Sequence, residues 1–165
     1  MMVALVRSRG EKRALRRSGE GGKRIEHLAF RLAGEMYAVQ IAHVAEILRL
    51  PPITDVPRAP RNVLGVLSVR GKLVTVIDLR RRFRLPESPH DGRTRILLAD
   101  VGTGEQIGLL VDDVQQVWRL ANEEIEPPSV LGGEQPAHIA GIGRPAGSEG
   151  LILILLDLRP IVEAP

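Results

Sequence analysis

Two stretches of the chain follow one pattern, and this repetition restricts the fold more than any other feature. In each stretch an apolar segment, a glycine-containing turn and a second apolar segment end in Asp-Leu-Arg, at 65–80 and again at 139–159. Short runs of valine, leucine and isoleucine between turn signals are typical of buried strands. The pattern predicts a mainly β chain with an internal duplication.

The duplication extends over most of the chain. Strand, glycine turn, strand is predicted at 28–41 and again at 96–111. After each pair, the apolar residues in 41–48 and 111–118 recur at spacings of three and four, which predicts a short helix. We expect copies of about sixty residues. They should form two small β-barrel lobes, approximately 25–85 and 94–162, which could exchange a strand.

The stretch GVLSVRGKLVTVIDLRRRF, at 65–83, gives the most detailed local prediction. Strands at 66–69 and 72–77 should be joined by a two-residue turn at Arg70-Gly71, because glycine tolerates the positive φ of hairpin turns. Asp78 suits the N-cap of a short helix. From spacing alone, Arg70 is a solvated cation at the tip of an apolar hairpin.

The second strand of this hairpin is apolar on both faces. Leu73 and Ile77 should lie on one face, with Val74 and Val76 on the other. We therefore expect this strand to be covered on both sides. A segment with four prolines in ten residues, 51–60, precedes the hairpin and is predicted to be a rigid connector.

Composition excludes several classes of function. The chain has no cysteine, so disulfides, zinc–thiolate sites and thiol nucleophiles are absent, which fits a cytoplasmic protein. With two Phe, one Tyr and one Trp, it is a poor platform for stacking nucleic-acid bases. The longest apolar run, 151–156, is too short to span a bilayer.

The positive charge is concentrated at the N-terminus. Residues 1–24 hold eight Lys or Arg against Glu11 and Glu20, a net charge of +6, so a total of +3 leaves the remainder at −3. We predict a basic, disordered extension over 1–24. There are two alternatives. The segment could be a basic helix that contacts anionic lipid or nucleic acid, or the start codon could be assigned too far upstream.

Candidate catalytic and metal-binding residues do not form a recognisable site. The four histidines, none of them at metal-ligand spacing from another, should be surface or loop residues: His27, His43, His90 and His138. Asp112 and Asp113 are adjacent, and one of them is expected to cap a helix. The sequence therefore predicts no enzymatic activity, no metal and no cofactor.

The ordered series of motifs resembles the CheW-like family of chemotaxis adaptors. The stretch GVLSVRGKLVTVIDLRRRF is similar to the family's GV-x-N-L-R-G turn and P-V-x-D-L-R-x-x-F strand. FRLAGEMYAVQIAHVAEIL, GLLVDDVQQVW, HIAGIGR and LILILLDLRPIV follow the family in the same order, from Ile25 to Val162. Ser68-Val69 replaces the usual Asn-Leu, and Thr75 stands where proline is common, so partner preference could differ.

This resemblance implies a fold and a function. The fold would be two small SH3-like β-barrel lobes with short helices around a shared apolar junction, in a single domain over 25–165. The function would be non-catalytic coupling of chemoreceptor cytoplasmic tips to the regulatory domain of a CheA histidine kinase. The pathway, flagellar, pilus or regulatory, stays open. Other CheW-like domains would associate with the protein in rings. Nucleic acid would not be a partner.

The resemblance also implies which residues bind partners. Arg70 matches the motif arginine, and Gly65 should lie with it on an exposed hairpin. Val44 and Glu46 match positions on the receptor-facing side, and Val117 matches one in the second lobe. A groove lined by Val and Leu between the lobes would receive a receptor helix tip. The alternative function, a basic-tailed β-barrel that binds nucleic acid or a membrane surface, predicts a basic stripe on the folded body.

Overall fold

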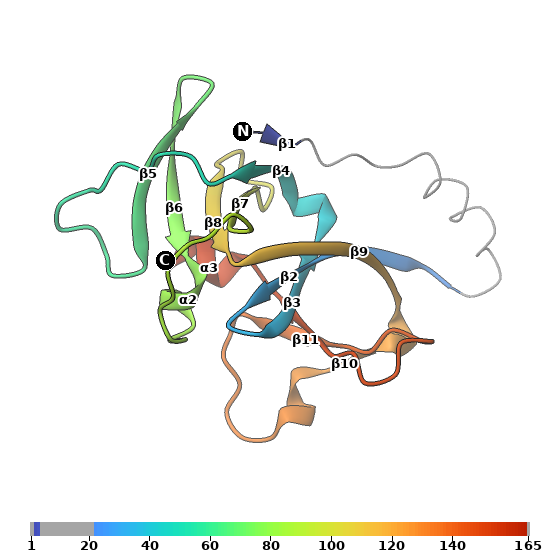
Figure 1. Ribbon diagram of the computed structural model, residues 1–165. Coiled ribbons are helices and arrows are strands. Elements are labelled where there is room, and N and C mark those ends of the chain that lie inside the picture. The colour runs from blue at the N-terminus through green and yellow to red at the C-terminus, as the bar shows by residue number, and fades with distance from the viewer. Residues whose placement is uncertain (1, 4–21, 165) are drawn as a thin grey trace.

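The chain folds into two lobes, each built on a six-stranded sheet (Figure 1). The computed structural model describes residues 2–3 and 22–164, so the extension predicted over 1–24 lies largely outside the described residues. The first lobe has the strand order β1-β4-β7-β8-β6-β5: β1 (Met2–Val3), β4 (Val44–Arg49), β7 (Arg95–Ala99), β8 (Ile107–Val111), β6 (Lys72–Asp78) and β5 (Val63–Val69).

The second lobe has the order β10-β11-β12-β3-β2-β9: β10 (Ile125–Glu126), β11 (Ile139–Gly143), β12 (Leu153–Leu156), β3 (Glu35–Gln40), β2 (Arg24–Leu32) and β9 (Asp113–Ala121). Two short helices, α2 (Leu79–Arg82) and α3 (Arg159–Glu163), follow β6 and β12. Three 3-10 turns complete the described elements: η1 (Ile41–His43), η2 (Asn122–Glu124) and η3 (Pro128–Leu131). The predicted mainly β, two-lobed fold class is confirmed.

The two lobes repeat one topology by exchanging hairpins. Apart from β1 and β10, the sheet orders are β4-β7-β8-β6-β5 and β9-β2-β3-β12-β11. Each contains one parallel pair at the same place, β6 with β8 and β12 with β3. The first copy contributes β2 to β6 and the second β7 to β12, so each sheet contains a hairpin from the other copy. The sequence predicts that lobes 25–85 and 94–162 could exchange one strand, whereas the structure exchanges two strands in each direction.

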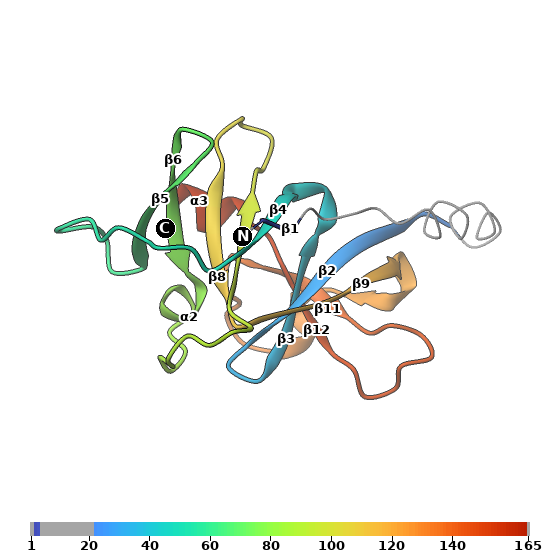
Figure 2. The ribbon, with the colours of Figure 1, turned by 45° about the horizontal axis from the view of Figure 1, so that its top comes forward.

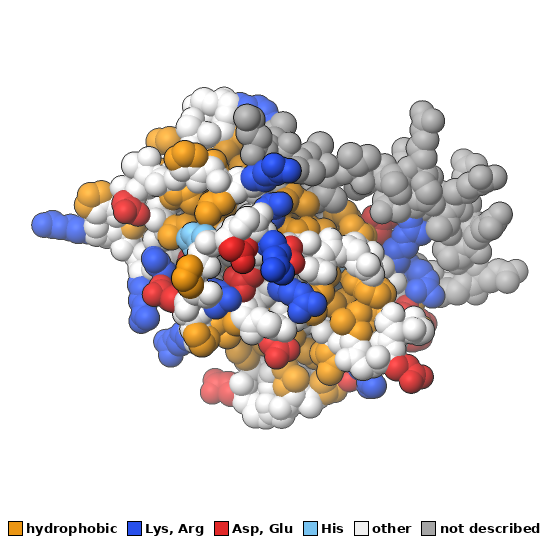
Figure 3. Space-filling model, viewed as in Figure 1, with side chains coloured by type: hydrophobic (Ala, Val, Ile, Leu, Met, Phe, Trp, Pro, Cys, Tyr) orange, Lys and Arg blue, Asp and Glu red, His pale blue; other side chains and the backbone are white. Residues whose placement is uncertain are grey.

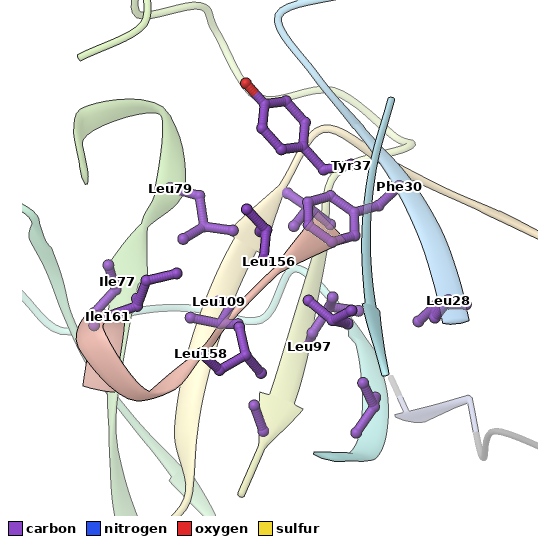
Figure 4. Close-up of a cluster of buried hydrophobic side chains, with 14 of the residues drawn as sticks. Leu28, Phe30, Tyr37, Ile77, Leu79, Leu97, Leu109, Leu156, Leu158 and Ile161 are labelled. Carbon is purple, nitrogen blue, oxygen red and sulfur yellow. The ribbon is translucent and has the colours of Figure 1, made fainter. Parts of the chain in front are cut away.

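The largest apolar cluster lies between the lobes, and the ends of both copies contribute residues to it. Asp78 caps α2 by accepting from the N–H groups of Arg80 at 2.9 Å and Arg81 at 3.4 Å. Leu79, which follows this cap, and its counterpart Leu158 are both buried in the shared junction (Figure 4). Two smaller clusters fill the individual lobes. The predicted Asp78 cap and the shared apolar junction are therefore present.

The helices predicted at 41–48 and 111–118 are wrong, because strands β4 and β9 occupy these segments. β4 is covered on both faces, with Ile47 in the junction cluster and Leu48 inside the first lobe. A register shift between Val44 and Glu46 adds a β-bulge, and the pairing of β2 with β9 shifts at the equivalent place. Two covered faces and a bulge together produce the apolar spacing of a helix.

The two-sided cover predicted for β6 holds at one end of the strand. Ile77 is completely buried in the junction, and Val76 is completely buried inside the first lobe. Leu73, on the same face as Ile77, is 77 % exposed. The strand therefore leaves the core as it approaches the hairpin turn.

The predicted surface location of the histidines is wrong for His27, which lies in β2 and is 4 % exposed. Its Nδ1 lies 3.0 Å from the carbonyl oxygen of Ile25 and therefore donates to it. Burial lowers the pKa of His27, and this hydrogen bond opposes the shift without cancelling it. Burial and the nearby charge of Arg82 also lower the pKa of His138, whose ring stacks on Phe83 with 4.3 Å between centroids.

Stability is expected to fall on mild acidification. Both histidines have a lower pKa folded than unfolded, so their contribution is complete above about pH 6.5 and is lost as the pH falls from there through the folded pKa. Each should cost up to about 1.4 kcal/mol per pH unit in that window. The thermal midpoint at pH 7.5, 6.5 and 5.5 measures this. His27→Gln should flatten the slope and the exposed-loop control His90→Gln should not; a flat wild-type profile would contradict the prediction.

Candidate functional site

The hairpin between β5 and β6 turns at Arg70-Gly71, as predicted. Both residues have positive φ, 50° and 80°, which is the geometry of a type I′ turn. Glycine adopts this conformation without strain, whereas arginine at positive φ is uncommon. The turn therefore holds Arg70 in a conformation that its own backbone disfavours.

Arg70 is an exposed cation at the turn, as predicted from spacing, and it also forms an ion pair with Glu46 of β4. The Arg70 side chain is 59 % exposed and that of Glu46 is 16 % exposed, and Oε1 of Glu46 accepts from the Arg70 guanidinium. This hydrogen bond and the carboxylate charge raise the pKa of Arg70. Oε2 of Glu46 is buried without a hydrogen-bond partner among the described residues. The pair places the Arg70 guanidinium beside the Glu46 carboxylate at the tip of the hairpin.

Gly65 lies in the same hairpin as Arg70, as the resemblance implied, but at a buried position. The chain leaving β4 passes directly over it. Thr54 and Val66 exchange two backbone hydrogen bonds of 2.9 Å. A Cβ at position 65 would lie 2.3 Å from the carbonyl oxygen of Thr54. Gly65 therefore permits the connector to close the first lobe against β5.

Gly65→Ala is expected to destabilise the protein by about 2–4 kcal/mol, because the methyl group collides with backbone that cannot move without breaking this closure. Urea denaturation measures the change. Gly92→Ala is a matched control, since a Cβ there meets nothing within 4 Å. Equal stability of the two variants would show that the connector adapts freely.

Val44 and Val117 lie at the junction rather than beside Arg70. Val44, in β4, is 9 % exposed and belongs to the junction cluster. Val117, in β9, pairs with Leu28 of β2 and packs against the same cluster. Of the five predicted residues, the structure brings Arg70 and Glu46 into direct contact, uses Gly65 for close packing, and places the two valines in the apolar junction.

A groove beside Arg70 is lined in part by Leu73, which the sequence pattern placed on a covered face of its strand. It has a volume of about 580 Å³ and is lined by 69–70, 72–75 and 104–106, including the exposed Leu73. The hairpin tip and the loop from β7 to β8 project side by side at this end of the first lobe (Figure 2). Proximity of Leu73 to the turn was the available signal, because residues beside a hairpin turn lie at the end of a sheet.

The adjacent carboxylates Asp112 and Asp113 do not form an acid–base pair, and Asp112 does not cap a helix. Asp112 accepts from the N–H of Ala33 at 2.9 Å and from Nε of Arg80 at 2.8 Å. Burial alone would raise the pKa of Asp112, but the bonds from Arg80 and Ala33 outweigh it and lower the pKa. Asp112 thus joins the β2–β3 turn to α2.

Fold and site together define a two-lobed β protein with an ion-paired arginine at an exposed hairpin tip. Comparisons with known proteins agree with the fold. The sequence model of the CheW-like domain matches residues 26–165. The chain is 32 % identical over 140 residues to the chemotaxis protein CheW of Klebsiella aerogenes, covering 84 % of this chain and 82 % of the relative. With CheW of Rhizobium meliloti it shares 30 % identity over 142 residues, 86 % of this chain and 88 % of the relative.

A solved structure gives the same answer. The scaffolding protein TtCheW from Thermoanaerobacter tengcongensis superposes with a TM-score of 0.77 at 29 % identity, over 86 % of this chain and 94 % of the relative. The chain belongs to the CheW-like family, a family of chemotaxis scaffold proteins. Among the described residues, no helix has the length and apolar character needed to cross a membrane.

Proposed function

We propose that this protein is a non-catalytic chemosensory adaptor that couples chemoreceptor cytoplasmic tips to the regulatory domain of a CheA-type histidine kinase. The observation that carries the proposal is the Arg70–Glu46 pair, which holds the motif arginine at the exposed tip of a hairpin. A guanidinium fixed in this way offers directed donors to a partner's carboxylate or carbonyl groups. Membership of the CheW-like family supplies the class of partner.

The remaining parts of the proposal follow from the same family. The protein acts in the cytoplasm, at chemoreceptor arrays, and other CheW-like domains join it in rings. The receptor is proposed to bind on the side of the protein that includes Glu46 and Val44. Val44 belongs to the apolar junction and Val117 packs against it, so both lie close to this proposed surface. Asp112, one of the carboxylates that could have suggested an enzyme, is held in a structural ion pair with Arg80, and the ring of His138 stacks on Phe83.

Binding of nucleic acid or a membrane surface is the weaker proposal. It requires a basic stripe on the folded body, yet residues outside 1–24 carry a net charge of −3. On the face shown in Figure 3, basic and acidic side chains of the described residues are interspersed. Nucleic-acid binding with a steep salt dependence that survives deletion of residues 1–24 would favour this weaker proposal.

Titration calorimetry of the full chain against the regulatory domain of the CheA-type kinase from the same organism tests the proposal. We expect specific, saturable binding, and stimulation of kinase autophosphorylation when receptor tips are added. A failure to bind any such kinase domain of the organism would refute the coupling function and leave the family assignment intact.

A further inference from the structure

The groove beside Arg70 exposes an unpaired strand edge. β6 pairs with β5 from Lys72 onward, but its pairing with β8 on the other side begins at Thr75 with Ile107. The two-residue turn makes Val69 and Lys72 the hydrogen-bonded pair next to it, so the N–H and C=O of Leu73 point away from β5. Among the described residues, no strand lies against this side of Leu73.

The loop before β8 is held in a shape that keeps this edge open. Oδ1 of Asp100 accepts from the N–H groups of Gly102 at 2.8 Å and Gly104 at 3.3 Å. Both glycines have positive φ, 96° and 83°, which allows the loop to turn away before β8 begins. The following residues form the opposite wall of the groove, 104–106. The open edge is therefore a built feature of the first lobe.

The second lobe shows that the topology does not require such a loop. There the equivalent hairpin, β2–β3, closes through two residues, Ala33 and Gly34, with Leu32 paired to Glu35. In the first lobe the β7–β8 connection runs over 100–106. The residue equivalent to Leu73, counted back from Asp157, is Ile152, which is 55 % exposed. The first lobe thus combines the apolar residue with a walled groove.

The side chains around the edge indicate what fits there. Leu73 offers apolar surface, 77 % exposed, and Arg70 and Lys72 flank it on the hairpin side. Glu105 lies on the loop side. Because side chains alternate along a strand, an added strand with an apolar residue opposite Leu73 would direct its next residue to the side of Lys72. A carboxylate at that next residue would complement the lysine.

We propose that β6 accepts an extended segment of the kinase regulatory domain by strand addition, with an apolar residue against Leu73 and a neighbouring carboxylate toward Lys72. The inference rests on the proposed function and names the surface through which one partner binds. Main-chain hydrogen bonds to Leu73 hold the segment, and the side-chain contacts select it. A helical receptor tip does not fit this edge, because its backbone groups are bonded within the helix.

Calorimetry with the isolated kinase regulatory domain, using full-length variants, tests the side-chain contact. Leu73→Ser is expected to weaken binding about tenfold or more, as for a buried apolar contact at an interface. Ile152→Ser is the matched control, an exposed apolar residue at the equivalent position of the other lobe, and should change affinity by less than about twofold. The substituted side chains are exposed, so both variants should fold.

Amide hydrogen exchange tests the backbone contact. The N–H of Leu73 should exchange rapidly in the free protein and about tenfold or more slowly in the complex. If the wild-type protein binds the kinase domain but Leu73→Ser binds equally well and the Leu73 amide stays unprotected, this inference is wrong and the coupling function stands. If Leu73→Ser weakens receptor-tip binding alone, the assigned occupant is wrong. No binding of kinase by the wild-type protein refutes both proposals.

Discussion

Ile77→Asp is expected to unfold the protein. Ile77 is completely buried in the junction between the lobes, on a strand paired on both sides. An aspartate there would lose the apolar contact and place a carboxylate in an environment without a cation partner. The combined cost, more than about 4 kcal/mol, is comparable with the whole stability of many domains. Circular dichroism and urea denaturation should show a protein that is largely unfolded in buffer.

Leu73→Asp is the matched control for this prediction. It introduces the same residue in place of a similar apolar one, on the same strand and the same face, at a position that is 77 % exposed. We expect its free energy of unfolding to stay within about 1 kcal/mol of the wild-type value. If the two aspartate variants were equally stable, the junction would be far more hydrated than its packing indicates.

The features that were predicted from sequence depend on residues close together in the chain. The turn at Arg70-Gly71 and the Asp78 cap each follow from a few neighbouring residues whose conformational preferences agree. The duplication was visible because both copies end in the same tripeptide. Local preference and tertiary structure point the same way at these positions, which is why short motifs were sufficient.

The features that were missed depend on pairing between distant segments. β4 was interpreted as a helix because a bulge and two buried faces hide the alternation of a strand. Nothing local indicates that β2–β3 and β7–β8 change places between the copies. The contact of Arg70 with Glu46 follows from the same closure, since β4 and the β5–β6 hairpin meet only when the first lobe is folded. A pattern of apolar residues does not report which strand lies beside which.

Arg70→Gln and Glu46→Gln are expected to impair the same interaction with the kinase domain. Arg70→Gln removes the guanidinium, and affinity should fall about tenfold or more if that group contacts the partner. The Glu46 side chain is only 16 % exposed, so it offers little surface to a partner. We expect it to act by holding Arg70 in position. Glu46→Gln keeps the shape but loses the charge that fixes the guanidinium. Its effect should be smaller, about threefold to tenfold.

The double variant separates positioning from direct contact. If Glu46 acts through Arg70, then Glu46→Gln should have little further effect once Arg70→Gln is present, and the two changes should be strongly non-additive. Additive losses would instead show that Glu46 contributes to binding independently of Arg70. Glutamine is preferred to glutamate at position 70, because a carboxylate there would repel Glu46 and mix a loss of stability with a loss of binding. Thermal midpoints of all three variants, measured beside the calorimetry, show whether the change lies in the contact or in the fold.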